Sequence, residues 1–177
     1  MYLCIRGKKK MSKTNMQLQP IGYARVDEEK GIFEVQIEEK FRPALKEFDK
    51  FTHVNILWWA HENDNPEKRE TTQIEEFPFF YGKETPTMGV FATRSEYRPN
   101  PIALSPSQIL HIDAKEGIIK LPYLDAYDGT PIIDLKPYLP MSDLIKSADY
   151  PEYLQHWPRS SEETMEWWAK QAEEHNH

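Results

Sequence analysis

The chain has 177 residues, 39% of them hydrophobic and 12% aromatic, which favours one packed globular domain with at most an appendage. Its formal net charge of -7 excludes a protein that is basic overall, so any contact with nucleic acid has to come from a local basic patch. No apolar run approaches the ~18 residues of a membrane span and no secretory leader is evident, so we expect a cytoplasmic protein without a membrane partner.

The first 19 residues show no sustained hydrophobic period and carry the run Lys8-Lys9-Lys10. We predict a disordered N-terminal tail in residues 1–19, with a basic arm for RNA as the alternative. The one cysteine of the chain, Cys4, falls in this tail and can form neither an internal disulfide nor a Cys-rich zinc site. We therefore expect an incidental thiol and no metal site.

Short segments of alternating or continuous apolar residues predict a mainly β domain. Residues 21–26 and 33–37 are expected to form a hairpin, because Glu28-Glu29-Lys30-Gly31 supplies a turn between them. Residues 52–60 are apolar on both faces and predict a central strand. Further strands are expected at residues 88–93, 102–110, 118–124 and 132–136.

Two helices are expected at the periphery of these strands. Residues 41–50 place Phe41, Leu45 and Phe48 on one face, with Pro43 in the first turn, which predicts a short amphipathic helix. Residues 160–174 begin with the capping-box sequence Ser-Ser-Glu-Glu and predict a terminal helix of about four turns. Its apolar stripe would consist of Met165, Trp168, Ala169 and Ala172.

Residues 94–101 interrupt the strand pattern with a polar loop of restricted backbone. Pro99 and Pro101 fix two φ angles, and the residue before each proline is driven towards an extended conformation. The arginines Arg94 and Arg98 lie in this loop together with the amide of Asn100. The pattern favours a loop that holds a ligand in fixed geometry, and a proline-rich corner with solvated arginines is the alternative.

The block Asp128-Gly129-Thr130-Pro131 predicts a tight turn, because Asp-Gly tolerates positive φ and the proline fixes the exit. The glycine would let the backbone approach a ligand closely, and the aspartate could accept hydrogen bonds from ribose hydroxyls. In the strand that follows, Asp134 and Lys136 share one face. An internal ion pair and a chemical role explain that spacing equally well.

Three blocks of this sequence resemble the signature of a known family. The blocks are GVFATRSEYRPNPIALS at residues 89–105, DGTPIIDLKPYLP at 128–140 and, more weakly, FTHVNILWWAH at 51–61. They are similar to motifs of the TsaA-like (TrmO/YaeB) family, S-adenosylmethionine-dependent methyltransferases that act on threonylcarbamoyladenosine in tRNA. The Pro-Arg-Gln cluster that this family carries in its first hairpin is missing here, as is its basic, glycine-rich segment between residues 63 and 86.

The resemblance implies a small, largely antiparallel β-barrel over residues 20–145. The two helices predicted above would lie at its periphery, the second of them in a helical C-terminal extension at 146–177, where larger bacterial members of the family carry an extra domain. It also implies a homodimer with cofactor sites near the subunit interface. The aromatic residues 77–81 and Trp167-Trp168 agree with such a contact, since large apolar patches on a soluble protein usually mark interfaces. For residues 77–81, packing against the barrel of the same chain, a base-stacking surface and a lid over a small ligand are alternatives.

The resemblance also implies the residues of a site for S-adenosylmethionine. Arg94 is the expected partner of its carboxylate, because a guanidinium meets two oxygens at once. On the substrate side we expect Arg98, Asn100 and Lys136, and the unranked catalytic candidates are Asp128, Asp134 and Tyr138. The full set of expected cofactor-binding residues is His61, Glu62, Arg94, Leu104, Asp128, Gly129, Thr130 and Pro131.

We therefore predict an S-adenosylmethionine-dependent methyltransferase that modifies the N6 nitrogen of threonylcarbamoyladenosine in tRNA. A methyltransferase with a small molecule or another substrate is the first alternative, motivated by the acidic charge and the missing basic segment. A barrel that binds the cofactor without turnover is the second.

Overall fold

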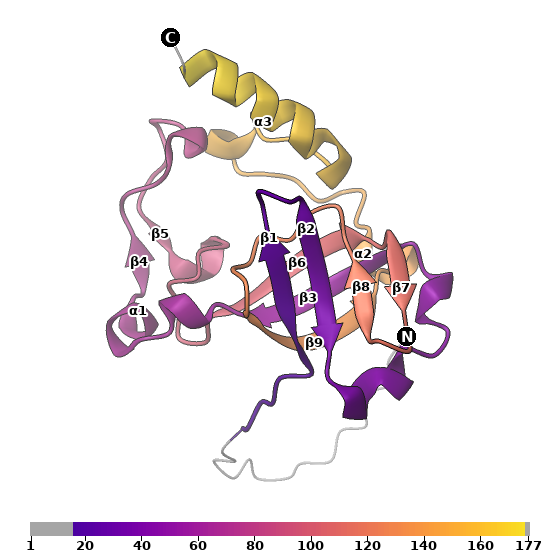
Figure 1. Cartoon of the computed structure of the whole chain (residues 1–177). Coiled ribbons are helices and arrows are strands. Elements are labelled where there is room, and N and C mark those ends of the chain that lie inside the picture. Colours follow the sequence, from indigo (N-terminus) through magenta and orange to yellow (C-terminus); the bar gives the residue numbers. More distant parts are fainter. Residues whose placement is uncertain (1–15, 176–177) are drawn as a thin grey trace, which may run out of the picture.

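Residues 16–175 are described by the computed structural model (Figure 1). Most of the N-terminal tail predicted at 1–19, including Cys4 and the lysine run, lies outside these residues. The described chain is mainly β, as predicted, and a seven-stranded sheet in the order β6-β3-β9-β1-β2-β8-β7 is its main element. Its strands are β1 (Gly22–Asp27), β2 (Ile32–Ile37), β3 (His53–Trp59), β6 (Ile102–Gln108), β7 (His111–Asp113), β8 (Ile118–Lys120) and β9 (Pro131–Pro137).

All neighbouring strands in this sheet are antiparallel. The strand order has two ends, β6 and β7, so the closed barrel expected from the resemblance is not confirmed. Strand β3 pairs with β6 on one side and with β9 on the other, which confirms its prediction as a central strand. The hairpin of β1 and β2 is confirmed as well, and the turn between them ends at Gly31 with φ +65°.

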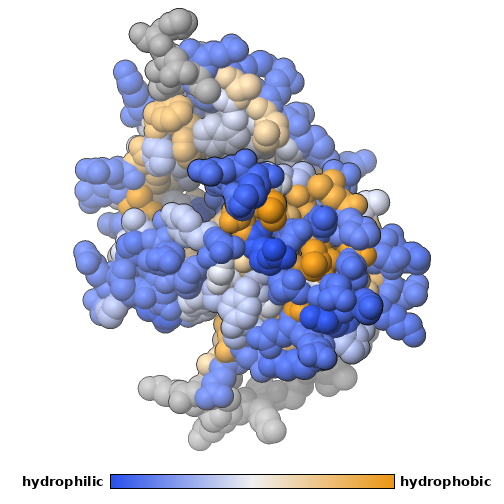
Figure 2. Space-filling model, in the orientation of Figure 1, coloured by the Kyte–Doolittle hydropathy of each residue, from blue (hydrophilic) through white to orange (hydrophobic). Residues whose placement is uncertain are grey.

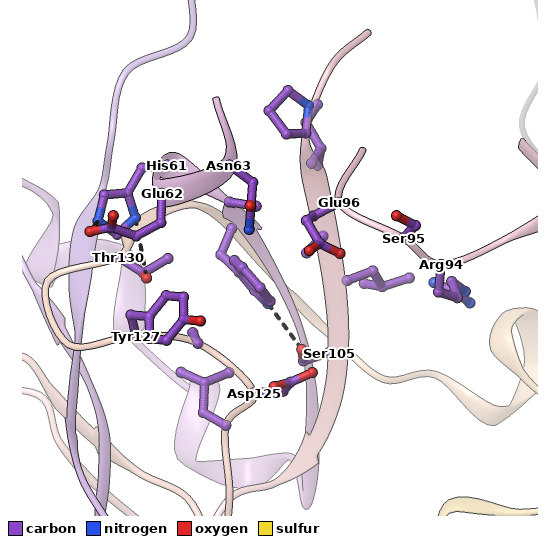
Figure 3. Close-up of a pocket in the computed structure, with 18 of the residues that line it drawn as sticks. His61, Glu62, Asn63, Arg94, Ser95, Glu96, Ser105, Asp125, Tyr127 and Thr130 are labelled. Carbon is purple, nitrogen blue, oxygen red and sulfur yellow. Dashed lines mark hydrogen bonds and ion pairs between the residues drawn. The ribbon is translucent and has the colours of Figure 1, made fainter. Parts of the chain in front are cut away.

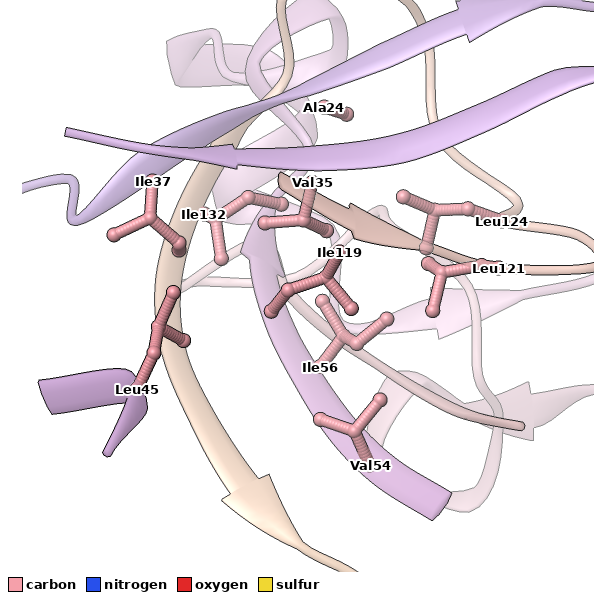
Figure 4. Packing of buried hydrophobic residues seen from close by; sticks show 10 residues of the cluster. All are labelled: Ala24, Val35, Ile37, Leu45, Val54, Ile56, Ile119, Leu121, Leu124 and Ile132. Carbon is pink, nitrogen blue, oxygen red and sulfur yellow. The ribbon is translucent and has the colours of Figure 1, made fainter. Parts of the chain in front are cut away.

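The core lies on one face of the sheet, where apolar side chains of five strands meet (Figure 4). Val35, Ile56 and Ile132 are fully buried there. The sheet curves around these side chains, because residues from strands far apart in the sheet order contact one cluster. The cluster consists of Ala24, Val35, Ile37, Leu45, Val54, Ile56, Ile119, Leu121, Leu124 and Ile132.

The strand predicted at residues 88–93 is wrong for most of its length. Only β5 (Met88–Gly89) is extended, paired with β4 (Gln73–Ile74) in a separate two-stranded sheet, and the 3-10 turn η5 (Val90–Ala92) follows. The carbonyl of Val90 accepts hydrogen bonds from Thr93 Oγ1 and Arg98 Nη2. Buried and exposed side chains alternate only from Met88 to Phe91, since Ala92 is exposed and Thr93 is buried. Local hydrogen-bond partners occupy the carbonyl that a β-ladder would have used.

The helix predicted at residues 41–50 is replaced by two 3-10 helices, η1 (Glu39–Leu45) and η2 (Phe48–Lys50). Pro43 lies inside η1 and has no N–H to donate, and Glu47 between the two helices has φ 64°. Both features prevent a continuous α-helix. Three further 3-10 turns, η3 (His61–Asn63), η4 (Phe79–Tyr81) and η6 (Glu152–Leu154), and the short helices α1 (Pro66–Glu70) and α2 (Pro140–Asp143) connect the other elements.

The terminal helix is confirmed as α3 (Ser161–His175), but the face that it turns to the protein differs from the predicted stripe. Of the predicted stripe, Trp168 packs against Phe80 but Met165 is 75% exposed, and Trp167, which is not part of that stripe, packs against Phe80 as well. The aromatic residues that we expected in a subunit contact therefore contact each other within the chain. In the part of the chain that is described, no helix is long and apolar enough to cross a membrane, and the face in Figure 2 is mostly hydrophilic with scattered hydrophobic patches.

Gly117 and Gly31 provide a test of the turn geometry, since both have positive φ but only one is crowded. A Cβ at Gly117 would lie 2.8 Å from Ile37 O and 2.9 Å from Arg42 Nε, whereas nothing lies within 4 Å of a Cβ at Gly31. We expect Gly31→Ala to lower the free energy of unfolding by about 1 kcal/mol and Gly117→Ala by about 2–4 kcal/mol. Urea unfolding measures both, and equal losses would contradict the clash.

Candidate functional site

A cavity of about 450 Å³ opens where β3 ends and β6 begins, within the 300–1,000 Å³ usual for ligand pockets (Figure 3). It lies between the loop of residues 94–98 and the segment that leads from β8 to β9. Its lining residues are Glu28, Trp58, Ala60, His61, Glu62, Asn63, Arg94, Ser95, Glu96, Arg98, Pro101, Ile102, Ala103, Leu104, Ser105, Pro106, Tyr123, Leu124, Asp125, Ala126, Tyr127 and Thr130.

Adjacent strands β3 and β6 give the cavity an apolar wall. Trp58 of β3 donates from Nε1 to Ser105 Oγ of β6 at 2.9 Å, which fixes the plane of the indole. Leu104 lies on β6 next to this serine, and the buried Leu124 belongs to the core cluster. A flat, apolar ligand could therefore pack here without leaving the indole N–H unpaired.

His61 and Thr130 meet at the end of β3, although 69 residues separate them in the sequence. Thr130 is only 1% exposed, and its Oγ1 lies 3.4 Å from His61 Nδ1. The other ring nitrogen, Nε2, lies 3.4 Å from a carboxylate oxygen of Glu62. The imidazole is thus held between a buried hydroxyl and an exposed carboxylate, in a position to contact a ligand.

Arg98 organises the loop that closes one side of the cavity. Its guanidinium donates to three backbone carbonyls: Nε to Ser95 O at 2.7 Å, and Nη2 to Thr93 O at 2.7 Å and to Val90 O at 3.0 Å. Ser95 N in turn donates to Thr93 Oγ1 at 3.2 Å. Arg98 lines the cavity, but most of its donors hold the backbone, so its main structural role is to shape the loop.

Arg94 differs from Arg98, because it has no hydrogen bond or ion pair with any of residues 16–175 and is exposed. Figure 3 shows it at one side of the cavity beside Ser95, with Glu96 closer to the centre. The loop therefore presents a guanidinium, a hydroxyl and a carboxylate to a ligand.

The predicted turn at residues 128–131 is present, but most of it supports the fold. Asp128 Oδ1 accepts a hydrogen bond from Val26 N at 3.0 Å, and Gly129 N donates to Ala24 O at 2.9 Å. Gly129 has φ +76°, which explains the need for glycine. Of the four turn residues only Thr130 lines the cavity. Asp128, Gly129 and Pro131 therefore affect the site only indirectly, because they fix the position of Thr130.

Four other predicted residues are not brought to the cavity. Asp134 and Lys136 form an ion pair of 2.6 Å on β9. Their spacing is therefore explained by an internal ion pair, without a chemical role. Tyr138 follows β9 and contacts His53 at the start of β3, roughly 20 Å from the end where His61 lies, at ~3.3 Å per strand residue. Asn100 is exposed and does not line the cavity, and its backbone carbonyl accepts a hydrogen bond from Ile102 N.

Three acidic residues and two tyrosines of the lining were not predicted. Glu96 stands inside the conspicuous loop and could have been chosen, and Asp125 and Tyr127 come just before the predicted turn. Glu28 and Tyr123 carry no local signal, because only the fold brings the first hairpin next to residue 123. Burial, and after it the charges of Asp125 and Glu28, raise the pKa of the Tyr123 phenol.

A charged cluster behind the loop supports it from α1. Arg69 pairs with Asp64, which also accepts from Trp59 Nε1 at 2.9 Å. The hydrogen bond from Arg69 lowers the pKa of Asp64 below its usual value. Lys68 Nζ lies 4.7 Å from the centre of the Tyr97 ring, a cation–π distance, so α1 contacts the loop directly. Among residues 16–175, no group of three or more histidine, cysteine or carboxylate side chains is arranged to hold a metal ion.

Comparison with known proteins assigns the family. The model of the tRNA-methyltransferase O N-terminal domain matches residues 12–144, which include every cavity-lining residue. The chain belongs to this family. Within the TrmO N-terminal domain of this chain, the cavity is built from the blocks 51–61, 89–105 and 128–140 and the residues that directly follow the first two, together with the first hairpin and residues 123–127.

Several TrmO relatives are similar over most of this domain. A probable S-adenosyl-L-methionine-binding protein of Pyrococcus horikoshii is 32% identical over 120 residues, which cover 68% of this chain and 80% of that protein. The tRNA (adenine(37)-N6)-methyltransferase of Escherichia coli is 37% identical over 107 residues, 59% of this chain and 43% of the relative. A probable S-adenosyl-L-methionine-binding protein of Archaeoglobus fulgidus is 34% identical over 115 residues, 65% of this chain and 28% of that protein.

The solved structures of TrmO proteins share the fold. A TrmO of Pseudomonas aeruginosa is 24% identical, with a TM-score of 0.56, and the match covers 77% of this chain and 62% of that one. A second TrmO structure gives 25% identity and a TM-score of 0.58, covering 77% and 64% of the two chains. This chain therefore spans less than half of the E. coli and A. fulgidus relatives and less than two thirds of these solved chains.

Trypsin provides a test of the role of Arg98. The bond after Arg94 is a possible cleavage site, whereas the bond after residue 98 precedes a proline and resists the enzyme. We expect Arg98→Ala and Arg98→Lys each to raise the rate of cleavage after Arg94 about tenfold, because lost hydrogen bonds to a charged donor cost about 1.5 kcal/mol or more and proteolysis follows the open population. The control is Arg25→Ala, which removes an exposed ion pair with Glu34 on the first hairpin. If the Arg98→Lys variant resists trypsin as well as the original chain does, only the charge of residue 98 matters.

Proposed function

We propose that this chain is an S-adenosylmethionine-dependent methyltransferase that modifies the N6 nitrogen of threonylcarbamoyladenosine in tRNA. The observation that carries the proposal is the convergence of His61, Arg94 and Thr130, from three separate segments, on one cavity. Glu62 and Leu104 join them, so five of the eight cofactor-binding residues implied by the resemblance line the same space. The activity named for the E. coli relative and the cofactor named for the archaeal relatives support it.

The residues of the cavity fit the three parts of this cofactor. The apolar wall of Trp58 and Leu104 suits an adenine ring, and the carboxylates of Glu62 and Asp125 can accept hydrogen bonds from ribose hydroxyls. The free guanidinium of Arg94 suits the carboxylate of the amino-acid part. When bound, the cofactor supplies an electrophilic methyl group on a sulfonium.

Methyl transfer leaves the protein mainly the work of positioning the acceptor and excluding water. The acceptor nitrogen also has to lose a proton. Asp128, Asp134 and Tyr138, the candidates from the sequence, have structural partners or lie outside the cavity lining. We assign this step instead to a carboxylate oxygen of Glu96, because this residue lies on the lining, has no ion pair within residues 16–175 and is not needed for the ribose.

The domain organisation follows the same proposal. Residues 20–145 would form the catalytic domain, a barrel-like sheet with the cofactor at the end of β3, and residues 146–177 a helical extension. We also propose a cytoplasmic homodimer. The aromatic cluster that packs inside the chain does not supply the contact, so we expect the subunits to meet on another surface.

A second candidate is methylation of a smaller, uncharged or cationic substrate. The observation that favours it is the charge of the cavity, whose lining has the four carboxylates of Glu28, Glu62, Glu96 and Asp125 against two guanidinium groups. One of the two guanidinium groups, that of Arg98, already donates hydrogen bonds to backbone carbonyls of the loop. A polyanionic substrate would have to approach along the loop side, where Arg94, Lys68 and Arg69 lie.

Arg94→Ala should weaken the binding of S-adenosylmethionine by about 2 kcal/mol, roughly 30-fold, because a charge-assisted pair to the carboxylate is lost. Titration calorimetry measures the change. The matched control is Arg25→Ala, which removes the same charge at an exposed position. Unchanged affinity in the Arg94 variant would remove this residue from the cofactor site.

The reaction itself is tested with labelled cofactor and tRNA that carries or lacks the threonylcarbamoyl group. We expect label only in the modified tRNA, and a yield that falls steeply with salt because phosphate contacts release counterions. A parallel incubation with a small-molecule extract tests the second candidate. Equal label in both tRNAs, or none in either, would contradict the proposed substrate, and cofactor binding without any turnover would indicate a binding protein.

A further inference from the structure

The segment that follows the family match packs against a part of the chain far from the main core. The match ends at residue 144, and the described chain continues through η6 and α3. Within residues 16–175, the core cluster and the side chains packed on it include nothing beyond Leu135. Instead, this C-terminal segment, residues 149–168, meets the arm of residues 71–89, which contains β4, η4 and β5; Figure 1 shows α3 beside η4 at the far end of the arm.

The first contact is centred on the carbonyl oxygen of Phe80. Trp157 Nε1 donates to it at 3.0 Å, and His156 Nε2 lies 2.9 Å from it. The rings add to this contact, because the Trp157 centroid lies 4.8 Å from that of Tyr81 and the Trp168 centroid 4.9 Å from that of Phe80. The carbonyl oxygen of Phe80 thus has two polar contacts, and the rings of Phe80 and Tyr81 each have a tryptophan neighbour, all from the C-terminal segment.

The second contact lies where the arm returns to the site. Tyr153 Oη lies 3.3 Å from Met88 Sδ, and Met88 is only 5% exposed. Leu154, the next residue of the segment, is buried as well. Met88 belongs to β5, which leads directly into the loop that closes the cavity.

The arm depends on these contacts, because its own sheet is very small. Strands β4 and β5 have two residues each, and a two-stranded ribbon is marginally stable by itself even when longer. Val90 then connects the arm with the cavity loop. Its N–H donates to Thr72 O at 3.0 Å, and its carbonyl accepts from Arg98, the residue that shapes the loop.

We propose that the C-terminal segment is a positioning element for the cavity, with Trp157 and Tyr153 as its positioning residues. They hold the arm, the arm fixes Val90, and Val90 with Arg98 fixes the orientation of Arg94, Ser95 and Glu96. This inference relies on the proposed function only for the choice of S-adenosylmethionine as the ligand to be measured.

Hydrogen exchange of the free, full-length protein tests the structural part. In Trp157→Ala we expect amides of residues 72–74 and 88–98 to exchange about tenfold faster, while β1, β3 and β9 exchange as before. Tyr153→Phe removes only the hydroxyl and should give a smaller change confined to 88–98. The control is Met165→Ala, on the exposed face of α3, which should change none of these amides. Unchanged exchange in the arm of both variants, or equally faster exchange throughout the sheet, would overturn the proposal.

Cofactor affinity tests the consequence for the cavity. We expect Trp157→Ala to weaken S-adenosylmethionine binding about three- to tenfold, a range typical of remote packing contacts that modulate a site. Combined with Arg98→Lys, the loss should be less than the product of the two single losses, because both variants release the same loop. A faster-exchanging arm with unchanged affinity, or strictly multiplicative losses, would refute the link. If the original chain binds no cofactor, the proposed function fails, while hydrogen exchange still decides whether the segment holds the loop.

Discussion

The site depends on the antiparallel pairing of β3 with strands on both of its sides. An antiparallel partner begins where the central strand ends, so the segments that precede β6 and β9 both lie next to the residues that follow β3. Ala60 N donates to Pro101 O at 2.8 Å on one side, and His61 meets Thr130 on the other. The burial of Val54 and Ile56 in the core fixes the register of β3. A slip of one residue would shift the end of β3 relative to the segments that precede β6 and β9, and these segments form the two sides of the cavity.

The same pairing explains which parts of the site could be predicted. The sequence blocks at 51–61, 89–105 and 128–140 can each be recognised from neighbouring residues. They meet in the structure because the end of β3 lies beside the starts of β6 and β9. Asp134, Lys136 and Tyr138 belong to one of these blocks, yet they run along β9 away from the cavity. A motif read from sequence does not say which of its residues face a ligand and which hold the fold, as Asp128 and Arg98 demonstrate with their backbone partners.

Elements with a strong period were predicted well, and elements decided by local hydrogen bonds were not. The hairpin of β1 and β2 and the central strand follow from side-chain patterns that the packed core uses, and the terminal helix α3 follows from its capping sequence and helical period, although it lies outside that core. The segment at 88–93 has the pattern of a strand, but an arginine five residues later binds its carbonyls. Glu28 reaches the cavity only through the tertiary fold, so its place in the lining could not be predicted from neighbours in the sequence.

The tryptophans of the chain fall into two separate groups, with a consequence for spectroscopy. Trp58 and Trp59 lie at the end of β3, whereas Trp157, Trp167 and Trp168 all belong to the C-terminal segment. Indole fluorescence would therefore come mostly from a region outside the main core, while circular dichroism in the far ultraviolet would follow the sheet. If the C-terminal segment detaches first, the two signals will change at different denaturant concentrations, and the chain will not behave as a single cooperative unit.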